Sequence, residues 1–108
     1  MSAPPPVVEL SRCEACRSPF LPTDGPCPRC GSSDVRPFSS PALGAVIAST
    51  ELTTPAEGWP APHRLALVEM PESVRLLAIV DGPLPVVGTI VSVRRDGAVY
   101  RARTEPGP

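Results

Sequence analysis

The 108-residue sequence predicts an all-β protein, in which a short cysteine-rich unit precedes a small β-barrel. Three observations favour this fold class. After Leu43, apolar and polar residues alternate in short runs that end at turn residues, which is the pattern of strands. All four cysteines fall within residues 12–38, where the sequence has no helical periodicity. Asp96-Gly97 is a strong hairpin signal between the last two alternating runs.

We expect the chain to divide into three parts. Residues 1–11 are predicted to be an extended lead-in, because three consecutive prolines favour polyproline geometry, and residues 7–10 can begin a strand. Residues 12–38 are predicted to form the cysteine-rich unit, and residues 39–104 the barrel.

Five strands are expected in the barrel, over residues 43–53, 65–70, 74–80, 88–94 and 98–103. In the third strand, Val74, Leu76, Ala78 and Val80 share one face, as alternate residues of a strand do. Gly44 is placed where a bulge or bend fits, near the start of the first strand. Five short strands without helices favour a closed barrel, because closure removes exposed strand edges.

The strongest chemical signal is a pair of short motifs, Cys13-x-x-Cys16 and Cys27-x-x-Cys30. Each motif lets one tight turn direct two sulfurs to the same point, and two such turns complete a tetrahedral four-sulfur site. Gly31, which follows the second motif, can take the left-handed conformation that lets backbone amides approach a sulfur. The sequence therefore predicts a structural zinc ion with Cys13, Cys16, Cys27 and Cys30 as ligands. Iron is the main alternative, because geometry alone does not separate the two metals.

The composition argues against catalysis by this chain alone. Its ten basic residues are all arginines, which excludes both a Schiff-base lysine and the lysine of a P-loop. The one histidine, His63, has no nucleophile motif to accompany it. A metal held by four thiolates has no open position for substrate or water. We therefore expect no catalytic residue.

Charge and hydropathy limit the partners and the location. The net charge is −1, so no strong positive field attracts nucleic acid or anionic lipid. No apolar run approaches the ~20 residues of a membrane span, and the first residues lack the pattern of a signal peptide. We expect a cytoplasmic protein without membrane contact, where paired cysteines bind metal rather than form disulfides.

The cysteine motifs and the segments after them resemble the zinc-ribbon/OB-fold proteins of the family called domain of unknown function thirty-five. The second motif matches as Cys27-Pro-x-Cys30-Gly31, and the barrel matches at residues 43–50 (LGAVIAST), 65–70 (LALVEM) and 87–91 (VGTIV). Three features depart from the family pattern, of which one is residues 71–73 (PES) in place of the usual acidic-glycine turn after the second barrel strand. Arg17 follows the first motif where the family usually has glycine, and only residues 1–12 stand where the family often has helical residues that grip a partner.

The resemblance implies a rubredoxin-like zinc ribbon followed by a five-stranded OB-fold barrel. It implies a non-catalytic accessory subunit of a thiolase-like or hydratase-like enzyme in acyl-CoA metabolism, which helps to bind coenzyme A. We expect ligand or partner contacts from Trp59, in the loop between the first two barrel strands, and from Arg94, Arg95 and Arg101 around the Asp96-Gly97 turn. Single-stranded nucleic-acid binding is the alternative, because OB-folds use basic grooves and aromatic platforms for that purpose. An iron-sulfur electron carrier is a third possibility.

Overall fold

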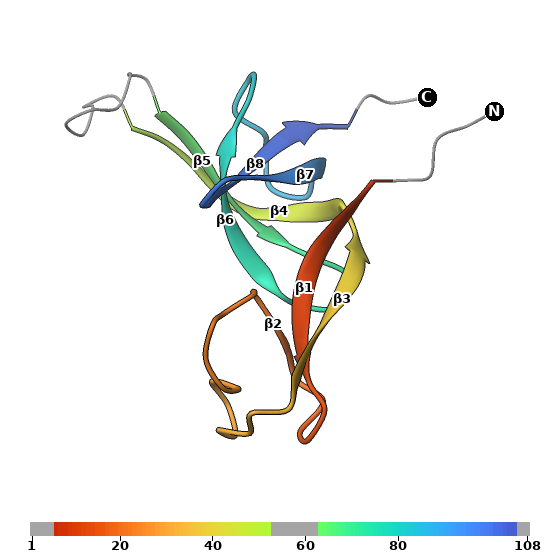
Figure 1. The fold of residues 1–108 in the computed structure, drawn as a ribbon. Coiled ribbons are helices and arrows are strands. Elements are labelled where there is room, and N and C mark those ends of the chain that lie inside the picture. The colour runs from red at the N-terminus through yellow and green to blue at the C-terminus, as the bar shows by residue number, and fades with distance from the viewer. Residues whose placement is uncertain (1–5, 53–62, 106–108) are drawn as a thin grey trace.

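The computed structural model describes residues 6–52 and 63–105 of the chain (Figure 1). These residues form eight strands and no helix, so no helix in this part of the chain could cross a membrane. The strands build a small three-stranded sheet, which bears the cysteines, and a closed five-stranded barrel. The prediction of an all-β protein with a cysteine-bearing ribbon and a barrel is confirmed.

The small sheet is built on one long antiparallel pair. Strand β1 (Val7–Cys13) pairs along its whole length with β3 (Val35–Pro41), and the short β2 (Pro19–Phe20) pairs with the other edge of β1. Val8 and Leu10 of β1 are only 3% and 0% exposed, because they pack in the same buried cluster as the barrel residues. The first half of β1 therefore completes the barrel core, and its last residue, Cys13, begins the ribbon. Division of the chain into separate units at residues 11 and 38 stays a prediction.

The barrel contains the remaining five strands, which are β4 (Leu43–Leu52), β5 (His63–Glu69), β6 (Arg75–Val80), β7 (Ile90–Asp96) and β8 (Val99–Thr104). They close in the order β4-β5-β6-β8-β7, with β6 and β8 parallel and all other neighbours antiparallel. This is the OB-fold arrangement, in which a three-stranded meander is closed on both sides by one hairpin. All five predicted strands are present, with ends that lie within two residues of the prediction.

The barrel core follows the alternation of the strands. Val74, Leu76, Ala78 and Val80 are all at most 7% exposed, as their shared face predicts. Gly44 lies where β4 closely approaches β5. The bulge or bend predicted near Gly44 is instead found between residues 46 and 48, where the pairing register of β4 with β5 shifts.

The turn of the β7–β8 hairpin is displaced by one residue from the prediction. Asp96 pairs with Val99, so Gly97 and Ala98 form the two-residue loop. Gly97 has a φ of 62°, whereas Ala98 is not among the residues with positive φ, and this is the arrangement of a type II′ turn. Asp96 is thus the last residue of the β7 strand, and its carboxylate accepts a hydrogen bond from Nε of Arg101 at 2.9 Å.

Candidate metal centre and neighbouring surfaces

Two similar turns position the four cysteines. The amide of Arg17 donates to the carbonyl of Cys13 at 2.8 Å, and the amide of Gly31 donates to the carbonyl of Cys27 at 2.9 Å. Arg17 and Gly31 both have left-handed backbone conformations, with φ values of 65° and 81°. The left-handed Gly31 is as predicted. Arg17 adopts the same conformation without the freedom of a glycine, so the first turn holds local backbone strain.

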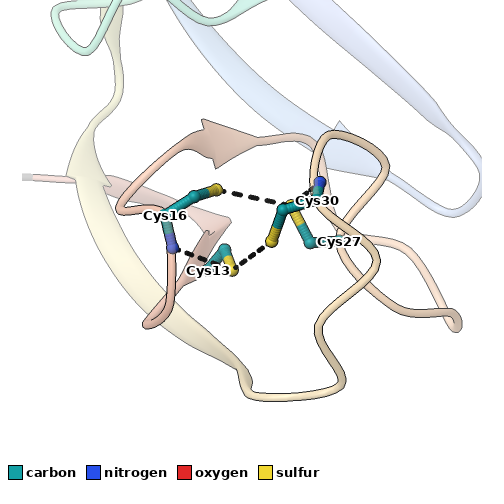
Figure 2. Close-up of side chains that lie close together, drawn as sticks. All are labelled: Cys13, Cys16, Cys27 and Cys30. Atoms are coloured by element: carbon teal, nitrogen blue, oxygen red, sulfur yellow. Dashed lines mark hydrogen bonds between the residues drawn. The ribbon is translucent and has the colours of Figure 1, made fainter.

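The four sulfurs converge on one point from these two turns (Figure 2). All four lie within 4.8 Å of one another. Sγ of Cys13 is 3.5 Å from Sγ of Cys30, and Sγ of Cys16 is 3.7 Å from Sγ of Cys27. A tetrahedral metal with bonds of about 2.3 Å to sulfur requires sulfurs roughly 3.8 Å apart. The four cysteines are therefore able to hold a metal ion in the predicted geometry.

Backbone amides point at the sulfurs of both motifs. The amide of Cys16 is 3.5 Å from Sγ of Cys13, and the amides of Arg29 and Cys30 are 3.3 and 3.4 Å from Sγ of Cys27. Such donors stabilise the thiolate over the thiol. The turns thus prepare the sulfurs for the charged form in which cysteine binds metal.

The thiols do not ionise independently of one another. Hydrogen bonding with Ser18 lowers the pKa of the Cys16 thiol to about 6. The backbone of Ser32 lowers the pKa of Cys30, but the neighbouring sulfurs, Cys13 first among them, raise it to about 12. A cation bound between the four sulfurs would offset this mutual repulsion of the thiolates.

The cluster is a closed site. Cys13 and Cys27 are buried, whereas Cys30 is exposed at the surface of the ribbon. Nη1 of Arg29 donates to Oγ of Ser18 at 3.0 Å, which ties the second turn to the first. Because four protein sulfurs fill a tetrahedral coordination sphere, this arrangement can hold a metal structurally but cannot present it to a substrate.

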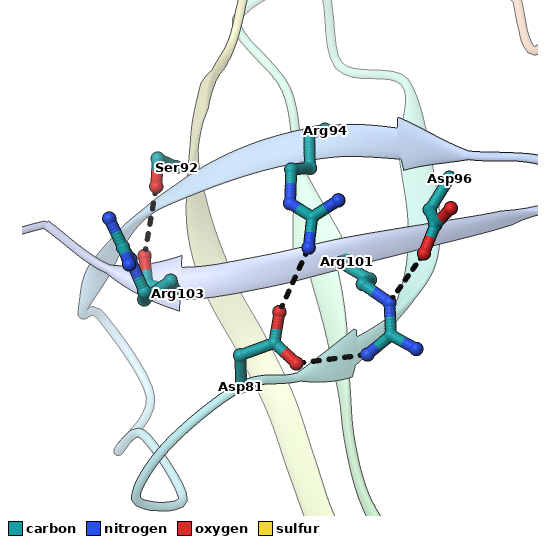
Figure 3. A network of polar contacts seen from close by, with 6 residues as sticks. All are labelled: Asp81, Ser92, Arg94, Asp96, Arg101 and Arg103. Carbon is teal, nitrogen blue, oxygen red and sulfur yellow. Dashed lines mark hydrogen bonds and ion pairs between the residues drawn. The ribbon is translucent and has the colours of Figure 1, made fainter.

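A second polar cluster lies on the outside of the barrel, over β7 and β8 (Figure 3). Arg94 and Arg101 are cross-strand partners. Arg101 approaches Asp81 and Asp96 at 2.9 Å each, and Arg94 approaches the other oxygen of Asp81 at 3.6 Å. The carboxylates of Asp96 and Asp81 raise the pKa of Arg101 above its ordinary value. The structure thus brings two of the three predicted arginines together and holds Arg101 in a fixed position.

A shallow pocket of about 480 Å³ opens beside this cluster. Its lining includes Arg94, Arg101 and Arg103, together with Asp81 and Ser92. Within the described part of the chain, Arg103 has no carboxylate at ion-pair distance. Arg103 and the loosely paired Arg94 are therefore the arginines best able to accept an anionic group here.

Two solved structures resemble the chain over nearly its whole length. A chain of the Ltp2-ChsH2(DUF35) aldolase matches with a TM-score of 0.72 and 26% identity, covering 91% of this chain and 84% of that one. A DUF35-family protein of unknown function from Sulfolobus solfataricus matches with a TM-score of 0.66 and 21% identity, covering 92% and 76%. The chain has the fold of the DUF35 proteins. The resemblance inferred from the sequence is thereby confirmed, although no protein-family model and no curated protein matches the sequence.

Of the other two residues predicted to make contacts, Arg95 lies away from the Arg94–Arg101 cluster and Trp59 lies outside the described residues. Nε of Arg95 donates to the carbonyl of Gly97 at 3.1 Å, and Arg95 lines a different pocket, next to the ribbon. Trp59 lies outside the described residues, so its contact role stays a prediction. Asp81 and Asp96, which position Arg101, were not expected as site residues. Each of these aspartates precedes a glycine in the sequence. An Asp-Gly pair predicts a turn, and it gives no sign that the aspartate forms an ion pair with an arginine.

Proposed function

We propose that this DUF35-fold chain is a non-catalytic accessory subunit of an acyl-CoA enzyme of the thiolase superfamily, or of a hydratase-like enzyme. The structural match to a chain of the Ltp2-ChsH2(DUF35) aldolase carries the proposal, since that chain is part of an enzyme. The closed four-sulfur cluster supports it, because a metal held there has no position for a reacting group.

Zinc is the metal we propose for Cys13, Cys16, Cys27 and Cys30. The zinc ion would stabilise the folded state, because it links Cys13 at the end of β1 to the second cysteine turn, across a segment with little secondary structure. The amides around the sulfurs orient the thiolates and stabilise their charge. The ribbon thereby becomes a rigid extension of the barrel.

The arginine-lined pocket is proposed to face the phosphate groups of the coenzyme A that the partner binds. Arginine suits this role because its planar guanidinium matches phosphate oxygens in pairs. Arg101 is held by two carboxylates, while Arg94 and Arg103 have donors to spare for a ligand. We retain Trp59 and Arg95 as further proposed contacts with the partner.

Reconstitution of the enzyme tests the accessory role. The complex is purified from native cells, the chain is removed, and the melting temperature and turnover of the freed enzyme are measured before and after the chain is added back. We expect loss of stability or turnover without the chain and recovery with it. Full stability and turnover of the freed enzyme would contradict the proposal.

A pair of arginine variants tests the coenzyme A contact in the reconstituted complex. Arg103→Ala should raise KM for acyl-CoA several-fold with little change in kcat, because it removes a binding contact rather than a reacting group. The control is Arg36→Ala, an arginine of the ribbon whose side chain is 71% exposed and forms an ion pair with nearby Asp34. An equal KM for the two variants would refute the phosphate contact. Binding of single-stranded DNA that weakens steeply with salt would instead support the nucleic-acid alternative.

A further inference from the structure

The outer face of β5 and β6 is aliphatic, where a solvent-exposed strand face is normally polar. Leu67 pairs with Leu77, and Leu65 pairs with Ile79, so the four side chains lie on one face of the two strands. Leu77 is 59% exposed, although the inward residues of both strands are buried. Nearly continuous apolar strands are typical of sheets that are covered on both faces. This pattern indicates that something covers the outside of the barrel at β5 and β6.

The loop between β6 and β7 extends the aliphatic surface on the far side of β4. Val86 and Val87 are 74% and 67% exposed, the highest values among the large apolar residues of the described chain. A hydrogen bond of 2.8 Å from the amide of Gly88 to the carbonyl of Val46 holds this loop along β4. The exposed valines are therefore presented by an ordered segment.

Small residues of β4 connect the two aliphatic regions. Ala48 pairs with Leu67 on one side, and Ala45 pairs with Ile90, which is 50% exposed, on the other. Alanines between long side chains allow another surface to approach the strand closely. We define the aliphatic face by six residues on five neighbouring segments (β4, β5, β6, the β6–β7 loop and β7), namely Ala45, Ala48, Leu67, Leu77, Val87 and Ile90.

The charges that border the aliphatic face along β5 and β6 are already paired within the chain. Glu69 and Arg75, the next cross-strand pair beyond Leu67 and Leu77, form an ion pair at 3.2 Å. On the β8 side, Arg101 is neutralised by its two carboxylates. Along β5 and β6, an uncharged apolar surface is thus complementary to this face. Since the described barrel strands form a closed barrel, the barrel itself offers no free edge for an added strand, and a partner at this face packs against it face to face.

We propose that the aliphatic face is the surface on which the enzyme subunit docks, through an uncharged aliphatic helix or sheet face of its own. This inference rests on the proposed function, because the resembling DUF35 chain that belongs to an enzyme points to an enzyme subunit as the occupant. Large exposed apolar patches on small soluble domains mark such interaction sites. The docking face and the arginine-lined pocket are adjacent around the barrel, since β6 pairs with β8.

Three glutamate substitutions in the tagged full-length chain test the docking face. Leu77→Glu places a charge within the face on strand β6, and Val87→Glu places one on the loop between β6 and β7. Val7→Glu is the matched control, because Val7 is 58% exposed but belongs to the small sheet. Each chain is used to capture proteins from the native lysate, with identification by mass spectrometry and with circular dichroism and metal content as folding checks. We expect the wild-type chain and Val7→Glu to retain a thiolase-superfamily or hydratase-like enzyme equally, and the other two variants to lose it at least ten-fold.

The outcomes separate this inference from the proposed function. Equal retention of that enzyme by Leu77→Glu, Val87→Glu and wild type would refute the docking face and leave the accessory role standing. Failure of the wild-type chain to retain any such enzyme would refute the accessory role, and the docking face with it. A wild-type chain that sediments alone as a dimer, and becomes a monomer with Leu77→Glu, would show that a second copy occupies the face and would overturn the inference.

Discussion

Replacement of Gly44 by alanine should strongly destabilise the barrel, because β4 crosses closely over β5 at this residue. An added Cβ would lie 2.5 Å from Cγ1 of Val68, 2.9 Å from the carbonyl oxygen of Glu69 and 3.0 Å from Sδ of Met70. Gly44 is not among the glycines with positive φ, so the backbone itself tolerates alanine and the penalty is steric. Overpacking a core costs about 1–3 kcal/mol. We expect a loss of about 3 kcal/mol, because the carbonyl oxygen cannot rotate away as a side chain can.

Urea unfolding followed by circular dichroism measures this loss. Gly25→Ala is the matched control, since a Cβ at residue 25 meets no atom within 4 Å. The control should be neutral or more stable by about 0.4–1 kcal/mol, because alanine restricts the unfolded chain. In a double-mutant cycle, Val68→Ala should reduce the penalty of Gly44→Ala but not remove it, since the backbone contact remains. An unfolding free energy for Gly44→Ala equal to that of Gly25→Ala would refute the close approach of the two strands.

Further substitutions test the ribbon and its junction with the barrel. Arg17→Gly should raise the unfolding free energy by about 1 kcal/mol in urea titrations, because it relieves a left-handed non-glycine residue, and Gly31→Ala should lower it by a similar amount. A lower unfolding free energy for Arg17→Gly than for the wild type would contradict the inference that Arg17 is strained in the conformation that Gly31 adopts in the second turn. Ser40→Ala should lower the unfolding free energy by about 1–2 kcal/mol in thermal melts, because the fully buried hydroxyl donates to Oε1 of Glu72 at 2.7 Å. Ser39→Ala, at the exposed neighbouring residue, is the control and should have the melting temperature of the wild type. Equal melting temperatures for Ser40→Ala and Ser39→Ala would argue against the hydrogen bond to Glu72.

The elements that depend on local pattern could be predicted from the sequence. The alternation of Val74, Leu76, Ala78 and Val80 identifies a strand and its buried face, and the cysteine spacing identifies the four sulfurs that lie close enough together to hold a metal ion. The role of β1 could not be predicted, because four alternating residues after a proline run do not reveal which surface they cover. Only the assembled structure shows that Val8 completes the barrel core.

The surface sites depended on strand register, which local sequence does not determine. Arg94 and Arg95 are adjacent in the chain, yet neighbouring residues of a strand face opposite sides, so only Arg94 joins the cluster with Arg101. The aliphatic face was equally hidden, because an apolar run such as residues 65–68 is consistent with a strand buried on both faces. Exposure of Leu77 became visible only once the pairing of β5 and β6 was known.

Native mass spectrometry of the tagged chain, purified from its own cells at moderate salt, tests the accessory role most directly. The predicted result is a complex in fixed ratio with a thiolase-superfamily or hydratase-like enzyme, in which each copy of the chain contributes the mass of one zinc ion. A colourless preparation should accompany it, since an iron centre with four sulfurs would be coloured. Recovery of the chain alone, or with nucleic acid that dissociates as the salt is raised, would contradict an accessory subunit of an acyl-CoA enzyme.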